Sequence, residues 1–281
     1  MIQMNWNNPT AHFPGRLLAI DTSTAAMSIA ILEAGQLLQE AHIHADRTHS
    51  LHLMPMIKQL ILDSGMKLAD LSAIAIGVGP GSYTGVRIGV TAAKTLAWTL
   101  NVPIIGVSSL EAMALGVVMS EEQTEESKEQ PQWIVPMMDA RRTQAYTGLY
   151  CLQGNKWKCL VSDGIRLVSQ WMEQLAQLAE VGQPEHDGLP EQTEQTEQTG
   201  LTMLPRISFV GEMTPFLEPL KPFLVANSGF SQIREAEIAA LHIGLLGSLR
   251  LAAGVRSDVH QIIPNYTQLT EAEVNLLAKL Q

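Results

Sequence analysis

The chain has 281 residues, of which 46% are hydrophobic, and a formal net charge of −10. This length allows one large domain or two small ones with a sizeable core. Residues 120–131 and 184–200 carry −4 and −5 of the charge, so the remainder is nearly neutral, which excludes a strongly basic nucleic-acid binder.

Two further features of composition bear on location. Cys151 and Cys159 provide no disulfide framework and are expected to be reduced core residues. The first sixteen residues are polar, and no uncharged apolar run in the sequence is long enough to span a bilayer. We therefore expect a cytoplasmic protein with no membrane partner.

The first part of the chain alternates short apolar strands with helices. In chain order we predict strands at Leu17–Asp21, Ala26–Leu32 and Leu37–His44, a helix from residue 48 or 50 to about Ser64, strand Ala73–Ile76, helix Ser82–Leu100, strand Ile104–Val107 and a helix from Ser108 to about Met119. The resulting order is βββαβαβα.

A similar order recurs in the second part of the chain. There we predict strand Trp133–Met138, a hairpin of Gln144–Cys151 and Lys156–Val161, helix Val168–Val181, strand Arg206–Val210 and helix Ala236–Ala253. The repeat indicates an α/β fold of duplicated βββαβα halves with a cleft between them.

Composition also predicts the domain boundaries. We expect five units, which are a flexible tail at residues 1–16, a first half at 17–119, an acidic linker at 120–131, a second half at 132–265 and a segment at 266–281 that can pack back on the first half. Within the second half, the insertion at residues 184–200 contains a threefold Glu-Gln-Thr repeat. The repeat has no apolar residue to offset the entropy of ordering, so the insertion is predicted to be disordered.

The segment from Gly77 to Gly89 is the most informative of the chain. It is a glycine-rich turn between a predicted strand and a predicted helix. Such a turn can cradle a phosphate, because glycine permits close backbone approach and a helix N-terminus offers free N–H groups. The candidate contacts are Gly79, Gly81 and Ser82. The segment lacks the Gly-Lys-Ser/Thr ending of a P-loop, so a packing role for the same glycines stays open.

Asp21 and Asp139 occupy matching positions, each at the end of the first strand of a half. Two carboxylates there, with Thr22 beside the first, can hold Mg²⁺ and position a phosphoryl group. This interpretation gives an ATP-binding phosphotransferase or hydrolase with ATP and Mg²⁺ as cofactors. The alternative is that each aspartate caps its own turn, as Asp, Ser and Thr commonly do, and that the protein has no cofactor.

Two helices of the first half carry a candidate interface. Small residues recur every four positions along the helix that follows the glycine loop, so they share one face. A helix that is small or apolar nearly all round is buried on more than one side. Its second neighbour is either the preceding helix or a helix of another subunit. The candidate interface consists of Leu53, Met54, Ile57, Ile61, Gly85, Gly89, Ala93 and Ala97.

Apart from that alternative use of Asp21 and Asp139, the sequence predicts neither a metal site nor a catalytic residue. The histidines cluster at His42, His44, His49 and His52, but no Cys or acidic residue accompanies them at a recognisable ligand spacing. A nucleophile elbow, a Cys–His signature and a His-Glu-x-x-His motif are all missing from the sequence.

Several segments together carry a family resemblance that covers most of the chain. The most specific is Gly79-Pro-Gly-Ser-Tyr-Thr-Gly-Val-Arg-Ile-Gly89. The others are residues 17–31, 48–50 and 70–107, Ser108-Ser-Leu-Glu-Ala-Met113, Met138-Asp-Ala-Arg-Arg142, Pro264-Asn-Tyr266 and Glu271-Ala-Glu273. They closely resemble the TsaB (YeaZ-like) family of tRNA threonylcarbamoyladenosine biosynthesis proteins. The N-terminal tail and the two acidic insertions lie outside the resemblance.

The resemblance implies a duplicated fold of the actin/Hsp70/sugar-kinase (RNase H-like) type. It also implies a role in forming N6-threonylcarbamoyladenosine at position 37 of tRNAs that read codons beginning with A. In that pathway the paralogue TsaD transfers the threonylcarbamoyl group, and TsaE is an ATPase partner. A TsaB-like subunit resembles a scaffold that docks TsaD through the helices of its first half.

One departure from the paralogue favours a partner subunit over a catalyst. TsaD-like chains carry a metal-binding His-x-x-x-His motif, whose matching positions here are Ser109 and Met113. A hydroxyl and a thioether cannot replace two imidazoles as metal ligands. We therefore expect a non-catalytic scaffold that contacts tRNA only through the complex, because a nearly neutral chain offers little to phosphates. We also expect the same helices to form a homodimer when the partner is absent.

Overall fold

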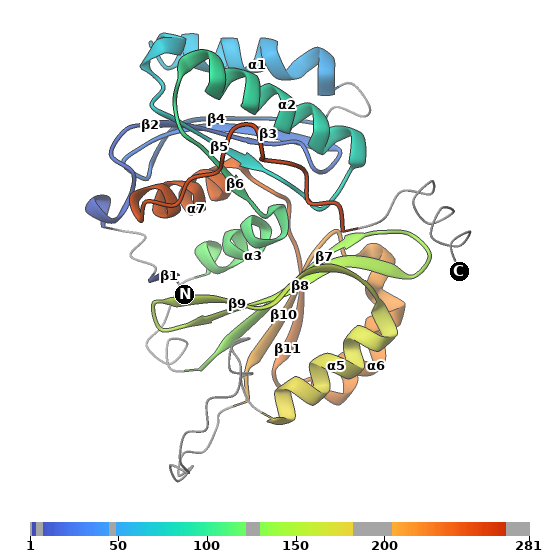
Figure 1. Cartoon of the computed structure of the whole chain (residues 1–281). Helices are drawn as coiled ribbons and strands as arrows, with labels where there is room; N and C mark the ends of the chain where they lie inside the picture. Colours follow the sequence, from blue (N-terminus) through green and yellow to red (C-terminus); the bar gives the residue numbers. More distant parts are fainter. Residues whose placement is uncertain (1, 4–7, 45–48, 122–129, 182–203, 268–281) are drawn as a thin grey trace.

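A computed structural model describes residues 2–3, 8–44, 49–121, 130–181 and 204–267 of the chain. These residues form two β-sheets with helices between and around them (Figure 1). One sheet has the strand order β4-β3-β2-β5-β6, and the other has the order β1-β9-β8-β7-β10-β11.

The first half contains the five-stranded sheet. Its elements are β2 (Arg16–Asp21), β3 (Ala26–Glu33), β4 (Gln36–His44), α1 (His49–Asp63), η2 (Leu68–Asp70), β5 (Ala73–Gly77), α2 (Tyr83–Leu100), β6 (Ile104–Val107) and α3 (Ser109–Ser120). Strands β2, β3 and β4 pair antiparallel, whereas β5 and β6 run parallel to β2.

The second half repeats this order. Its elements are β7 (Gln132–Asp139), β8 (Gln144–Gln153), β9 (Lys156–Leu167), α5 (Val168–Val181), β10 (Arg206–Gly211), η3 (Thr214–Phe216), α6 (Leu217–Ala226), β11 (Ser231–Glu235) and α7 (Ala240–Ala252). Three antiparallel strands are again followed by two that run parallel to the first. The predicted duplication of α/β halves is confirmed, although α6 and β11 were not predicted.

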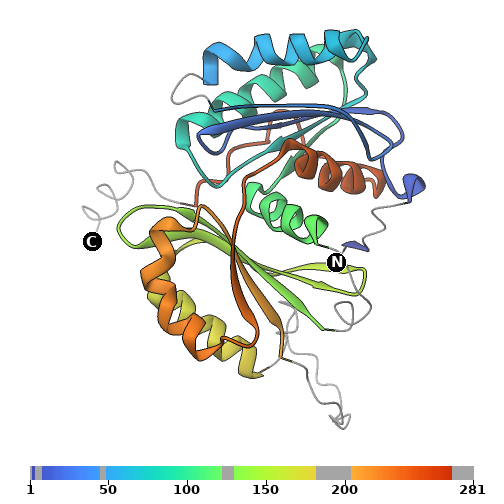
Figure 2. The ribbon, with the colours of Figure 1, turned by 180° about the vertical axis from the view of Figure 1, so that it is seen from behind.

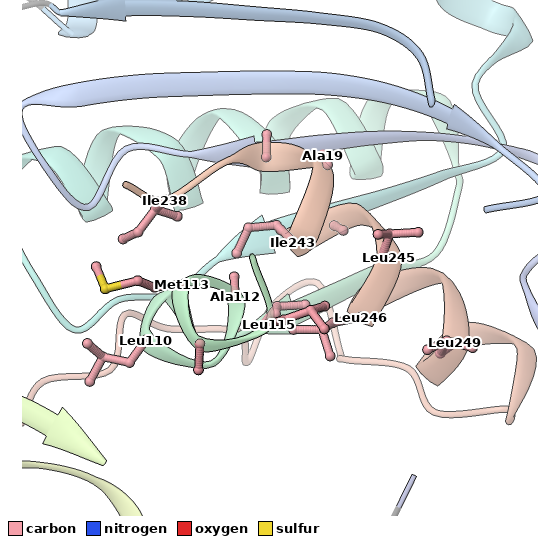
Figure 3. Packing of buried hydrophobic residues seen from close by; sticks show 14 of the residues in the cluster. Ala19, Leu110, Ala112, Met113, Leu115, Ile238, Ile243, Leu245, Leu246 and Leu249 are labelled. Carbon is pink, nitrogen blue, oxygen red and sulfur yellow. The ribbon is translucent and has the colours of Figure 1, made fainter. Parts of the chain in front are cut away.

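The helices form three layers around the two sheets. Helices α1 and α2 cover the outer face of the five-stranded sheet, and α5 and α6 cover the far face of the other sheet (Figures 1 and 2). Between the sheets lie α3 and α7, whose apolar side chains form one core cluster with residues of both sheets. Figure 3 shows Leu115 of α3 beside Leu246 of α7, with Ile243 between α3 and the first-half sheet.

The third helix of each half packs on the sheet of the other half. Helix α3 contacts β7, β8 and β10, whereas α7 contacts β2, β3, β5 and β6. Glycines make the second contact possible, because a Cβ on Gly244 would lie 2.4 Å from Leu32 Cδ1 and one on Gly247 would lie 2.7 Å from Ala75 Cβ. This exchange corrects the predicted boundaries at 17–119 and 132–265, because each range contributes a helix to the other half.

The predicted flexible tail at residues 1–16 is also corrected where the structure describes it, at residues 2–3 and 8–16. Strand β1 (Ile2–Gln3) pairs antiparallel with β9, η1 (Pro9–Ala11) follows, and His12 is buried. The predictions for most of the acidic linker, for the insertion at 184–200 and for residues 268–281 lie outside the described residues. Within the described parts of the chain, no helix is long and apolar enough to cross a membrane.

His242 provides a test of the α3–α7 packing. Its ring lies against α3, where a Cβ on Gly116 would be 2.7 Å from the ring, and burial lowers the pKa of His242 to about 4. His242 therefore stays neutral in the folded protein at pH values just below 6.5, where the same side chain takes up a proton in the unfolded chain. Stability is full above that pH and is lost as the pH falls toward 4, by about 2 kcal/mol between pH 7 and 5.

Urea unfolding at pH 7 and pH 5 measures this loss. The variant His242→Leu should show a pH-dependent loss smaller by about 2 kcal/mol than the parent chain, because residue 242 no longer titrates. An equal loss in the parent and in His242→Leu would contradict the buried, neutral state of His242.

Candidate functional site

The carboxylate of Asp21 is fully buried at the end of β2 and is bonded to its own chain. Its Oδ1 accepts hydrogen bonds from the backbone N–H of Ser23 (2.8 Å) and from the Ser23 hydroxyl (2.7 Å). Its Oδ2 accepts a bond from the Ser109 hydroxyl (2.6 Å) at the start of α3. Burial raises the pKa of Asp21 above its usual range, while the bonds from Ser109 and Ser23 act in the opposite direction.

Gly77 explains why this carboxylate fits. A Cβ on Gly77 would lie 1.8 Å from Asp21 Oδ2 and 3.0 Å from Ser109 Oγ, so no larger residue can stand there without displacing the carboxylate. The first glycine of the glycine-rich segment therefore serves close packing against Asp21.

The loop that follows uses its backbone groups within the chain. The N–H of Gly79 donates to Ser109 Oγ (3.2 Å), and its carbonyl accepts from the N–H of Ser109 (3.0 Å). The N–H of Ser82 donates to the carbonyl of Ser23 (2.7 Å), and the Ser82 hydroxyl accepts from Gly85 N–H (3.2 Å) as the N-cap of α2. The N–H groups of Gly79 and Ser82, predicted to face a phosphate, are directed at protein atoms in this conformation.

The second half closes over the same loop. A Cβ on Gly81 would lie 2.2 Å from the carbonyl oxygen of Ser23 and 3.0 Å from Cε of Met138, at the end of β7. The loop therefore lies between the end of β2 and the end of β7.

The two aspartates nevertheless have different surroundings. Asp139 is exposed, and its Oδ1 accepts the N–H of Arg141 (2.7 Å). This bond opens a turn in which Arg141, Arg142 and Thr143 have φ values of 66°, 54° and 60°. Such left-handed conformations are uncommon for residues other than glycine, and a short Asp bond to the backbone helps to hold them.

The ridge of small residues on α2 faces the sheet and not the solvent. A Cβ on Gly85 would lie 2.2 Å from the carbonyl of Thr22, and one on Gly89 would lie 2.3 Å from Thr22 Oγ1. The Thr22 hydroxyl donates to the carbonyl of Gly85 (2.8 Å), and Ala93 and Ala97 are buried. The glycines let the end of β2 approach α2 closely, so the placement of this ridge in a partner interface is wrong.

Three of the four interface residues predicted on α1 are buried as well. Leu53, Ile57 and Ile61 pack in the cluster between α1, α2 and the sheet, and only Met54 is exposed. Besides Tyr83 at the start of α2, four large apolar side chains of these two helices reach solvent. They are Leu51 (69% exposed), Met54 (47%) and Leu62 (58%) of α1 and Trp98 (70%) of α2, which we call the outer helix face.

Sequence reasoning missed three of these four residues, although a signal was present. Leu51 and Leu62 are eleven positions apart, which places them on one helix face roughly opposite to Leu53 and Ile57, and Met54 lies at the edge of that face. Apolar residues on both faces of α1 indicate that one face meets the sheet and the other a different surface.

The positions that match the paralogue's metal ligands are part of the core. Ser109 bonds Asp21, and Met113 is buried between the sheets. The described residues contain no group of three or more His, Cys, Asp or Glu side chains placed to hold a metal ion. His42 lies 3.1 Å from a Glu40 carboxylate oxygen, and His44 lies 3.9 Å from one of Glu237.

A polar network that was not predicted joins the two halves behind the loop. Glu111 of α3 bonds Arg250 of α7 (2.5 Å) and accepts the indole N–H of Trp157 in β9 (3.1 Å). Asp163 of β9 accepts hydroxyl groups of Ser108 and Tyr150 at 2.5 Å each. Burial raises the pKa of both Asp163 and Tyr150, and the nearby Asp163 charge raises that of Tyr150 further.

The contact between Gly89 and Thr22 yields a prediction. Gly89→Ala should destabilise the protein by about 1–3 kcal/mol, because the added methyl group overlaps Thr22 Oγ1, even though alanine is the better helix former. The loss should shrink in a Thr22→Ala background, and urea unfolding of the four chains of this double-mutant cycle measures it.

Gly229→Ala is the matched control, because a Cβ there meets no atom within 4 Å. It should leave the unfolding midpoint nearly unchanged. If Gly89→Ala were as stable as the parent chain in both backgrounds, α2 would not pack on Thr22 as described.

Known proteins resemble this chain over about half to nine-tenths of its length. A family model described as TsaD: tRNA N6-adenosine threonylcarbamoyltransferase matches residues 42–276. The tRNA threonylcarbamoyladenosine biosynthesis protein TsaB of Bacillus subtilis (strain 168) is 33% identical over 92% of this chain and 96% of its own length. The protein of the same name from Escherichia coli (strain K12) is 38% identical over 48% of this chain and 54% of its own length.

A solved structure agrees in fold. YeaZ from Pseudomonas aeruginosa superposes with a TM-score of 0.62 at 24% identity, over 90% of this chain and 99% of that chain. With the duplicated halves and the glycine segment that joins β5 to α2, these similarities establish the family. The chain belongs to the TsaB family of tRNA threonylcarbamoyladenosine biosynthesis proteins.

Proposed function

We propose that this protein is a non-catalytic scaffold subunit of the complex that forms N6-threonylcarbamoyladenosine at position 37 of tRNAs reading codons that begin with A. In this role it docks and supports a TsaD-like catalytic subunit, together with a TsaE-like ATPase, in the cytoplasm. Its relatives carry the name of this biosynthetic pathway, and the family model is that of the transferase itself.

The observation that carries the proposal is the outer helix face. The four large apolar side chains of this face are exposed, whereas other sides of the same two helices are filled by core residues. Exposed apolar residues that gather on one face commonly mark a protein–protein contact. Trp98 is the natural anchor, because tryptophan is enriched among the residues that dominate binding energy.

The chemistry of the loop supports a scaffold rather than a catalyst. Asp21 is buried and saturated by Ser23 and Ser109, and the site positions of the paralogue hold Ser109 and Met113. A nearly neutral chain leaves most of the tRNA affinity to the partner subunit. In the absence of that partner, the same outer helix face is the expected contact of a homodimer.

The experiment is a titration of this chain with its TsaD-like partner, read by calorimetry. Trp98→Ala should weaken binding at least 30-fold, as expected for an anchor worth about 2 kcal/mol. Leu51→Ser and Leu62→Ser should each weaken it less. Light scattering of the isolated chain should show loss of the homodimer in the same variants.

Val225→Ser is the control, because Val225 is as exposed as Trp98 but belongs to α6, which covers the far face of the other sheet (Figure 1). It should bind the partner like the parent chain. Unchanged affinity of a folded Trp98→Ala chain, or equal losses in Trp98→Ala and Val225→Ser, would reject the outer helix face as the docking surface.

A second titration separates the scaffold from the alternative phosphotransferase that would use Asp21 and Asp139. Calorimetry with ATP and Mg²⁺ on the isolated chain should give no heat of binding and no nucleotide turnover. Binding with turnover that is lost in Asp21→Asn but not in Ser169→Ala, an exposed position on α5, would favour the phosphotransferase.

A further inference from the structure

We propose that the N-terminal residues of this chain form a clasp that holds the two halves at a fixed angle. The N-terminal clasp has two arms, Ile2–Gln3 and residues 8–13, and each arm is bound to a different half. This role is independent of the partner-docking function and concerns a segment that lies outside the resemblance to the family.

The first arm binds the second half. Strand β1 pairs antiparallel with the outer edge of β9, with Ile2 opposite Trp157 and Gln3 opposite Lys156. Trp157 is fully buried, stacks on Tyr150 at 5.7 Å between ring centroids and donates its indole N–H to Glu111 of α3. The arm is therefore attached to a well-packed part of the second sheet, next to the layer formed by α3 and α7.

The second arm binds the first half and α7. The His12 ring is buried against the β3–β4 turn, where a Cβ on Gly35 would lie 2.4 Å from the ring. The N–H of Phe13 donates to both the carbonyl (3.2 Å) and the hydroxyl (3.0 Å) of Ser248 in α7. Ala11 and Phe13 also pack against the core cluster between the sheets.

The tether between the arms is short. Five peptide units join Gln3 to Asn8, and a chain of that length spans at most about 17 Å even when fully extended. Figures 1 and 2 both place β1 between α7 and the β8–β9 hairpin, at the end of the molecule away from the β7–β8 turn. The halves cannot separate far at this end unless one arm is released.

The clasp acts beside a second connection between the halves. The Glu111–Arg250 bond joins α3 to α7, and Glu111 also accepts the bond from Trp157, the residue that β1 faces. The halves also share the apolar core cluster around α3 and α7, so the clasp adds a restraint at this end of the molecule to those of the core and of the Glu111–Arg250 bond. Releasing the clasp should widen the range of angles between the halves without unfolding either of them.

Distances between two spin labels, measured by double electron–electron resonance, report the range of angles between the halves. The labels are placed at Lys58→Cys on α1 and Glu218→Cys on α6, both exposed, in a chain with Cys159→Ser and Cys151→Ser. The full chain should give one narrow distance distribution. Deletion of residues 1–7, which removes β1 and leaves the second arm, should at least double its width, and His12→Ala should broaden it less.

Thr10→Ala is the matched control, because Thr10 is exposed in the same segment and bonds only Asn8 among the described residues. It should leave the distribution unchanged. Amide hydrogen exchange on the same chains reports folding: after the deletion it should rise in Lys156 and Trp157 and stay unchanged in α2.

Two results would overturn the proposal. One is a folded deletion chain whose distance distribution is as narrow as that of the parent. The other is exchange that rises throughout β7 and β8 together with β9, which would make the N-terminal residues a general stabiliser of the second sheet. If the deletion chain does not fold, His12→Ala replaces it as the test, because this substitution loosens only the arm on the first half. A distribution as narrow as that of the parent would then contradict the proposal. Neither readout involves a partner, so these results leave the docking proposal untouched.

Discussion

One buried carboxylate fixes the ends of several elements in the first half. Asp21 binds the hairpin turn through Ser23 and the start of α3 through Ser109. Ser109 in turn holds Gly79, and the carbonyl of Ser23 holds Ser82 at the start of α2. An ionised group in this position would be costly without such partners. The position of α2, and with it the outer helix face, therefore depends on this set of bonds.

Most of the architecture could be predicted from the sequence because each half follows a simple apolar pattern. Two elements of the second half that were not predicted have weak patterns for physical reasons. Helix α6 is short and contains Pro219 and Pro222, which lower helix propensity. Strand β11 lies at the edge of its sheet, where its side chains are only partly buried and no clean alternation is needed.

The candidate site was harder to predict because the residue pattern of a helix does not identify the element that packs against each of its faces. The four-residue spacing of Gly85 and Gly89 correctly indicates a close approach. It does not indicate whether the approaching group is a partner helix or, as here, Thr22, more than sixty residues earlier in the chain. For the same reason Leu51 and Trp98 were not predicted to be exposed, because a sequence does not distinguish an exposed apolar residue from a buried one.

The exchange of third helices has a consequence for synthesis. The inner face of the first-half sheet, with Ala19 and Ala75, is covered by α7, which lies near the end of the chain. While the ribosome makes the intervening residues, that apolar face has no native cover. Domains usually fold in the order in which they emerge. Here the earlier half cannot complete its core until residues 240–252 have been made, so the two halves must mature together.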